Sequence, residues 1–277
     1  MKITATDIQR FSAWLTAEEK TPATIAKYVR EARRFSTWLA GRDVLKPLTR
    51  SYKAELTEKR APAGVNGAIA ALNCLFHFLN LPECRLKSLK IQRPVFRDED
   101  RELSQAEYRR LLSAAREARN ERLLLTMETL CATGIRVSEL KFFTAEAVRR
   151  GRADVANKGK VRTVFLPVKL QKRLLRYAAA QGITAGPIMI TRSGKPLDRS
   201  NIWSDMKKLC RAAGVAEAKV FPHNLRHLFA RTYYDLEKDI VRLADILGHA
   251  SINTTRIYTM ETGEVHRRQL EKMRLVI

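Results

Sequence analysis

Residues 132–140 read ATGIRVSEL, and this stretch indicates the fold of the second half of the chain. Gly134 is typical of a residue that ends one helix, and Arg136 opens the next, with Glu139 one turn further on. Residues 223–227 read HNLRH and follow a proline, which favours the start of another helix. We therefore expect a mainly helical domain that carries one arginine at a helix start and a second arginine beside two histidines.

The two arginines belong to a set of groups that suits phosphoryl transfer. Residues 247–258 read LGHASINTTRIY and end in Tyr258, and residues 157–160 form a lysine-rich turn, NKGK. In such a set the arginines hold a phosphate, the tyrosine attacks it, and other groups move protons. Because the pKa of free tyrosine is about 10, the site must remove its proton during the attack. In this order, the motifs predict cleavage of a phosphodiester without a metal ion.

Each motif has a simpler interpretation when it is taken alone. An isolated arginine and glutamate in a GxRxxE pattern usually form a surface ion pair, and a lone helical tyrosine usually packs in a core or on a surface. His223 and His227 are four residues apart, which also suits a zinc pair. The metalloprotease pattern needs glutamate directly after the first histidine, where this chain has Asn224, and no third ligand is indicated. We therefore expect neither a metal nor a cofactor.

The net charge predicts a polyanionic partner. The 277 residues include 52 lysines and arginines against 29 aspartates and glutamates, which gives a formal charge of +23. Both halves of the chain are basic, which favours a protein that grips DNA along its length. Binding to a membrane surface is the alternative, but the sequence has no basic amphipathic helix flanked by an apolar anchor.

The cysteines and the N-terminus indicate a cytoplasmic protein. The four cysteines are scattered without CxxC spacing, which is typical of buried thiols in a reducing compartment: Cys74, Cys84, Cys131 and Cys210. The first residues have no signal-peptide core, and no apolar run approaches the length of a transmembrane helix.

The first ninety residues read as a four-helix bundle followed by a basic segment. Apolar residues recur at three- and four-residue steps, with prolines at two of the helix starts. Helices are expected near residues 5–17, 22–40, 50–60 and 62–79. Residues 85–102 lack this periodicity and are rich in lysine and arginine. They form either an extended linker that tracks a DNA backbone or a solvated connector.

A second domain is expected from residue 103. Residues 104–107 read SQAE and have the form of a capping box, and a following helix is expected to end at Thr133. The pattern then changes to two short strands around the NKGK turn. The expected elements are strands at 153–155 and 161–166, a helix at about 169–181, a short strand at 188–190, and helices from about 200. The predicted fold class is mainly α with a small β-sheet.

Taken together, the motifs resemble the tyrosine recombinases of the phage integrase family over almost the whole chain. The strongest matches are TGIRVSEL at 133–140, HNLRH at 223–227 and LGHASINTTRIY at 247–258. The catalytic positions of that family fall on Arg136, His223, Arg226 and His249 around the phosphate, on Tyr258 as the nucleophile, on Lys158 as the hairpin lysine that protonates the leaving 5′ oxygen, and on Glu139 and His227 as supporting residues. Lys160 stays open as the alternative to Lys158.

The resemblance implies two domains that close on DNA as a C-shaped clamp. These are a helical, SAM-like core-binding domain over residues 1–84 and a catalytic domain over residues 103–277, joined by the basic linker 85–102. The chain is similar to the minimal two-domain Xer type, with no room for an additional arm-binding domain. The implied partners are a double-stranded recombination site, a homotetramer on DNA, and an accessory directionality factor or partner recombinase, with no membrane.

The implied reaction is site-specific recombination, in integration, excision or resolution, through a 3′-phosphotyrosine and without metal or ATP. A type IB topoisomerase uses nearly the same groups, but the separate HNLRH and LGH motifs and the helical first domain favour a recombinase. A non-catalytic DNA-binding accessory protein of the same fold would be expected to lack the tyrosine or an arginine, and this chain lacks neither.

Overall fold

A computed structural model describes residues 1–92, 99–157, 159–260 and 263–275. The chain divides into two compact units, Met1–Arg93 and Pro94–Ile277, and each is described by itself. None of the helices in the described part is long and apolar enough to cross a membrane.

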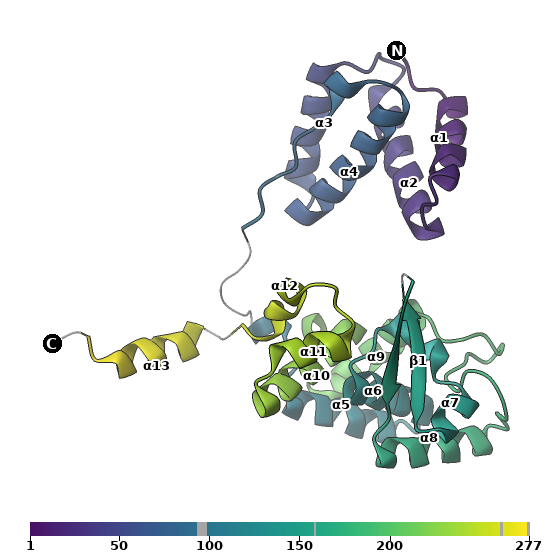
Figure 1. Cartoon of the computed structure of the whole chain (residues 1–277), viewed down its shortest axis with the longest axis vertical. Helices are drawn as coiled ribbons and strands as arrows, with labels where there is room; N and C mark the ends of the chain where they lie inside the picture. The colour runs from purple at the N-terminus through teal and green to yellow at the C-terminus, as the bar shows by residue number, and fades with distance from the viewer. Residues whose placement is uncertain (93–98, 158, 261–262, 276–277) are drawn as a thin grey trace. The chain divides into compact units, whose positions relative to one another are not determined.

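The first unit is a bundle of four helices (Figure 1): α1 Ala5–Ala17, α2 Pro22–Leu39, α3 Lys46–Lys59 and α4 Pro62–Phe78. Thr4 and Asp7 form a capping box at the start of α1, and Thr21 caps α2. Helix α4 packs against the other three, and its face contributes Phe76 to a core shared with Phe11 and Phe35. All four predicted helices are present, although α3 begins earlier than expected because its first turn includes a proline.

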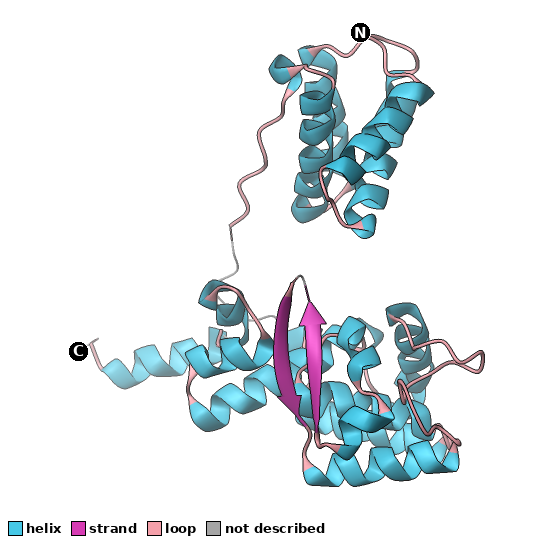
Figure 2. Ribbon diagram, turned by 45° about the vertical axis from the view of Figure 1, so that its right-hand side comes forward, coloured by secondary structure: helices cyan, strands magenta, loops and turns pink. Residues whose placement is uncertain are grey.

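The second unit is mainly helical, with one small sheet (Figures 1 and 2). Its principal helices are α5 Gln105–Glu117, α6 Glu121–Thr133, α7 Ala145–Arg149, α8 Val168–Ala180, α9 Arg199–Ala213, α10 Pro222–Glu237, α11 Ile240–Leu247, α12 Ile252–Thr255 and α13 Gly263–Met273. Helix α6 lies at the centre, in contact with α5, α8, α9 and α10, and it buries Leu125 and Met127 completely. Ser104 and Glu107 form the predicted capping box of α5.

The sheet is a single antiparallel hairpin, drawn in magenta in Figure 2. Strand β1, Arg152–Asn157, pairs with β2, Lys160–Phe165, with Arg152 opposite Phe165 and Asn157 opposite Lys160. Side chains alternate between the two faces of the hairpin, so Val164 is buried while Val161 and Phe165 are exposed. The predicted hairpin is therefore present, and its inner face packs on the helical unit.

Two predicted elements differ from the structure. Residues 188–190 do not form a named strand: Ile190 makes an isolated bridge with Pro196, although Ile188 and Met189 are buried as a strand pattern requires. Their apolar run is satisfied by core packing rather than by strand pairing. Tyr258 does not lie in one of the α-helices expected from about residue 200, because α12 ends at Thr255 and a separate 3-10 turn, Arg256–Tyr258, follows.

A close approach between α6 and α10 depends on one glycine. Gly134 ends α6 with a φ of +63°, a left-handed conformation that L side chains rarely adopt. A Cβ atom there would lie 2.3 Å from Cδ1 of Phe229 on α10. Gly134 is therefore needed for two independent reasons: the backbone is left-handed there, and Phe229 leaves no space for a Cβ atom.

We predict that Gly134→Ala lowers the free energy of unfolding by about 3 kcal/mol, because backbone strain and overpacking add. Gly214→Ala is the matched control, since Gly214 also ends a helix with a φ of +59° but has no atom within 4 Å of its Cβ position. The control should cost only about 1 kcal/mol, the strain alone. Equal losses in urea unfolding would contradict the packing argument.

Candidate active site

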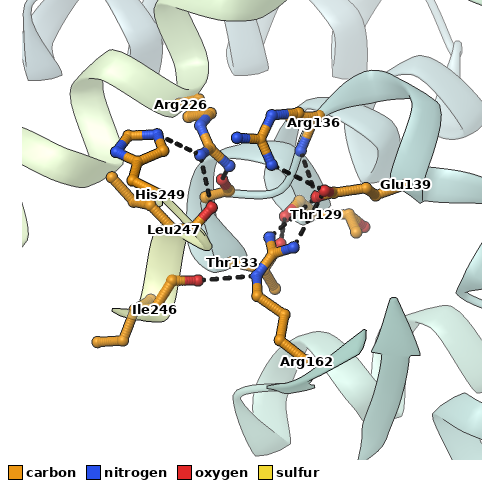
Figure 3. A network of polar contacts seen from close by, with 10 residues as sticks. Thr129, Thr133, Arg136, Glu139, Arg162, Arg226, Ile246, Leu247 and His249 are labelled. Carbon is orange, nitrogen blue, oxygen red and sulfur yellow. Dashed lines mark hydrogen bonds and ion pairs between the residues drawn. The ribbon is translucent and has the colours of Figure 1, made fainter. Parts of the chain in front are cut away.

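Arg226 is the most deeply buried cation of the site, with 1% of its surface exposed. It lies on the first turns of α10, and its Nη1 donates a hydrogen bond to the carbonyl oxygen of Gly134. Its Nη2 donates to the carbonyl oxygen of Leu247 at 2.7 Å and lies 2.9 Å from Nε2 of His249 (Figure 3). The guanidinium therefore joins three segments that are far apart in the sequence: the ends of α6 and α11 and the start of α10.

Burial disfavours the charge of Arg226 but does not remove it. Desolvation, followed by the nearby charge of Arg136, lowers the Arg226 pKa to about 10, and contacts with Tyr258 and Glu139 oppose the shift. The group therefore stays a cation at neutral pH. Its Nε is buried and has no hydrogen-bond partner among the described atoms. Such an orphaned donor is costly unless a ligand satisfies it.

Arg136 begins the 3-10 helix η3, Val137–Phe142, directly after the turn at Gly134. Its backbone N–H donates to Oε2 of Glu139 at 2.9 Å, and its Nη1 donates to Oε1 at 3.0 Å (Figure 3). The Arg136 side chain keeps 31% of its surface exposed, whereas Glu139 keeps 1%. The Glu139 carboxylate thus holds Arg136 in place through these two hydrogen bonds and leaves part of the guanidinium accessible.

Arg162 is a member of this network that the sequence analysis missed. It projects from β2, and its Nη1 and Nη2 donate to the two carboxylate oxygens of Glu139 at 3.0 and 2.9 Å. Its Nε donates to the carbonyl oxygen of Ile246 at 3.0 Å. The available signal was strand alternation, because position 162 faces inward beside the exposed Val161, and a charge on the inner face of a strand needs a partner.

The charge of Glu139 is stabilised despite its burial. Desolvation raises its pKa, but hydrogen bonds from Arg162 and from the backbone of Arg136, with the charges behind them, outweigh this and hold the pKa at about 2. Glu139 is therefore an anion at every physiological pH, held between two cations.

Tyr258 lies beside the histidines of the HNLRH and LGH motifs. Its ring centroid is 4.9 Å from that of His227, edge to face, and 5.9 Å from that of His249, nearly parallel. The His223 ring follows, 4.7 Å from that of His227. The tyrosine is only 4% exposed and packs with Leu247 of α11. All the motifs that the sequence analysis selected, apart from the hairpin lysine, meet here.

The histidines are neutral at pH 7. Desolvation and the charge of Arg226 lower the pKa of His227 and of His249 to about 4. His249 also has a defined tautomer: arginine only donates hydrogen bonds, so Nε2 of His249 accepts from Arg226 and Nδ1 donates to Oγ1 of Thr255 at 2.9 Å. His223 is the most exposed of the three residues, and desolvation, followed by repulsion from His227 and Arg226, lowers its pKa to about 4 as well.

A cavity of about 700 Å³ opens beside these groups. Arg136, His223 and Arg226 line it, and Lys141 and Arg199 add further positive charge to its wall. Among the described residues, no cluster of histidine, cysteine or carboxylate side chains is arranged to hold a metal ion. The cavity therefore presents a cationic, hydrogen-bonding wall that suits an anionic ligand.

The two candidate hairpin lysines lie outside the described part of the structure: Lys158 entirely, and Lys160 with its side chain. The choice between them stays a prediction.

Comparison with known proteins identifies relatives over most of the chain. The model of the phage integrase family matches residues 101–264. A tyrosine recombinase XerA of Thermococcus kodakarensis is 30% identical, covering 97% of this chain and 95% of that protein. A tyrosine recombinase XerD of Xanthomonas axonopodis is 37% identical over a shorter part, 53% of this chain and 52% of the relative.

Solved structures show the same fold. The crystal structure of a XerA recombinase covers 98% of this chain and 99% of the other, at 25% identity and a TM-score of 0.53. The structure of XerH bound to its difH substrate before cleavage covers 95% of this chain and 84% of XerH, at 18% identity and a TM-score of 0.73. The structure of a λ integrase dimer bound to a core site covers 94% of this chain and 96% of the integrase chain, at 17% identity and a TM-score of 0.74.

Proposed function

The chain belongs to the phage integrase family, the tyrosine recombinases, and from this premise we propose that it cuts and rejoins DNA through a covalent link between Tyr258 and a 3′ phosphate. The observation that carries the proposal is the contact of Arg226 with His249, whose ring stacks on that of Tyr258, while Arg226 also lines a cavity together with Arg136 and His223. These groups supply a nucleophile, a phosphate clamp and proton acceptors.

The arginines are proposed to hold the scissile phosphate. Arg226 is fixed by three segments and keeps a buried Nε donor without a partner in the described structure, and Arg136 keeps an accessible guanidinium edge. Negative charge builds on the nonbridging oxygens during attack, and preorganised cations stabilise it without rearrangement. The proposed chemical step therefore uses arginines in the role that divalent metals have in many other phosphoryl-transfer sites.

The tyrosine attacks phosphorus, and its phenolic proton leaves as the new bond forms. The neutral imidazole of His227 lies edge to face with the Tyr258 ring and is a suitable acceptor at pH 7, in contrast to a protonated one. The bond to the 5′ oxygen breaks, and we propose that Lys158 protonates this oxygen. The product is a 3′-phosphotyrosine. A 5′ hydroxyl from a second strand reverses the step, so that no ATP is needed.

The proposed substrate is a double-stranded recombination site, bound by a homotetramer during strand exchange. Two related structures support this proposal: a λ integrase dimer bound to a core site and a λ integrase tetramer bound to a Holliday junction. We propose that residues 1–84 bind the core of the site, that 85–102 form a basic linker and that 103–277 carry out the chemistry. A cytoplasmic location follows from the DNA substrate and the unpaired cysteines.

We predict that Tyr258→Phe abolishes a covalent adduct while DNA binding is kept. The site is first identified by selecting bound duplexes from a random pool, and a nicked form of it then traps the cleaved state. Wild type should give a complex that survives denaturant. Tyr233→Phe is the matched control, because Tyr233 packs against the same apolar cluster, and it should form the adduct normally. An undiminished adduct in Tyr258→Phe would remove Tyr258 from the mechanism.

For the general acid, we predict that Lys158→Ala cleaves an ordinary site slowly but recovers on DNA with a 5′-bridging sulfur. A thiolate leaves without needing a proton, so the loss of an acid no longer matters. Lys160→Ala should show only a modest, salt-dependent loss on both substrates. Recovery of Lys160→Ala alone would reverse the assignment, and recovery of neither would assign the proton to another group.

A further inference from the structure

Arg162 joins its own strand to two other segments of the chain. Its side chain leaves the hairpin strand β2, grips both oxygens of Glu139 in η3, and donates from Nε to the carbonyl oxygen of Ile246 in α11. Only 16% of the side chain is exposed. Its stem also lies against Gly248, where a Cβ atom would be 3.0 Å from Cδ of Arg162. A planar fork of donors can make these bonds together, whereas an ammonium group cannot.

The hydrogen bonds at Glu139 are shared evenly between two arginines. Oε1 accepts from Nη1 of Arg136 and from Nη1 of Arg162, and Oε2 accepts from the backbone N–H of Arg136 and from Nη2 of Arg162. Arg162 therefore fixes the plane of the carboxylate, and the carboxylate fixes Arg136. Figure 3 shows this order, with Arg162 and Arg136 on opposite sides of Glu139.

The arrangement also matters for charge. A buried carboxylate beside a phosphate-binding arginine repels the phosphate and neutralises the arginine. With Arg162 bound on its other side, the group of three residues keeps one net positive charge. The cavity wall formed by Arg136 thus remains attractive to an anion, although its anchor is itself an anion.

We propose that Arg162 is a positioning residue for the phosphoryl-transfer step. It holds Glu139 so that Arg136 faces the phosphate, and through Ile246 and Gly248 it fixes the segment that carries His249. Because it projects from β2, it also links the hairpin to the phosphate clamp. This inference rests on the proposed function, since it assigns a role within that same site.

The test compares cleavage rates on two DNA substrates. One carries an ordinary phosphate at the cleavage position, and the other carries a methylphosphonate, in which a methyl group replaces a charged nonbridging oxygen. The correct position of Arg136 contributes less to the cleavage rate of the neutral substrate, because less negative charge builds up on its nonbridging oxygen. If Arg162 acts through Arg136, the defect of an Arg162 variant relative to wild type must shrink on the methylphosphonate, as the defect of Arg136→Ala does.

We expect Arg162→Met to cleave the ordinary site roughly 10- to 100-fold more slowly, since small misplacements of a clamp have effects of this size. Noncovalent DNA affinity, measured in a Tyr258→Phe background, should change little. Arg162→Lys keeps the charge but reaches fewer acceptors, so its rate should be intermediate. Arg173→Met is the matched control: Arg173 is a partly buried arginine paired with Glu128, between α8 and α6, and its loss should leave both rates near wild type.

Equal defects of Arg162→Met on both substrates would overturn the proposal, because a merely structural role does not depend on the charge of the phosphate. An unchanged rate would also overturn it. If circular dichroism shows that the methionine variant is unfolded, the same comparison is made with Arg162→Lys, whose retained charge pairs with Glu139. Absence of any adduct in wild type on the ordinary site would instead refute the proposed function, a result separate from all of these.

Discussion

The buried carboxylate of Glu139, held between Arg136 and Arg162, is the interaction on which the rest of the site depends. A buried anion without a partner would be unstable, and two arginines this close together would repel each other. The three together make a connected group whose hydrogen bonds are all satisfied at the carboxylate. This group joins the turn after α6, the hairpin and the end of α11, and it does so close to the cavity wall.

A second, independent set of contacts completes the same frame from the other side. Arg226 binds the carbonyl oxygens of Gly134 and Leu247 and contacts His249. The turn at Gly134 therefore serves both sets: it ends α6, admits Phe229 of α10, and offers its carbonyl to the second arginine. The two guanidinium groups are fixed by backbone carbonyls and one carboxylate rather than by each other. Such preorganisation is what charge stabilisation in a transition state requires.

Much of this was predictable from sequence because the relevant signals are local. Gly134, Pro222 and the capping box at Ser104 specify helix ends through backbone chemistry, and the structure confirms them. The proximity of the motifs was predictable only because their combination suits one reaction, and the family resemblance supported the same assignment. Helix periodicity predicted the first bundle for the same local reason.

The remainder depended on tertiary contacts. Arg162 lies in an ordinary alternating strand, and nothing in its immediate neighbours identifies Glu139 or Ile246 as its partners. The apolar run at residues 188–190 predicts a strand that the structure does not form, since a short buried run has the same pattern whether it pairs or only packs. Likewise, no proline or glycine near Thr255 predicts that α12 ends there and that a separate turn follows to Tyr258.

The central claim, that Glu139 is a charged anchor between two arginines, is tested most directly by NMR. Side-chain carboxyl carbons of glutamate are labelled with ¹³C, and the Glu139 resonance is assigned by comparison with Glu139→Gln. The account predicts no titration of this resonance between pH 7 and pH 4, because the pKa of Glu139 is held at about 2. A midpoint at or above the ordinary value of 4.5 would contradict it, since the carboxyl group would then lack the stabilisation by Arg136 and Arg162 on which the site depends.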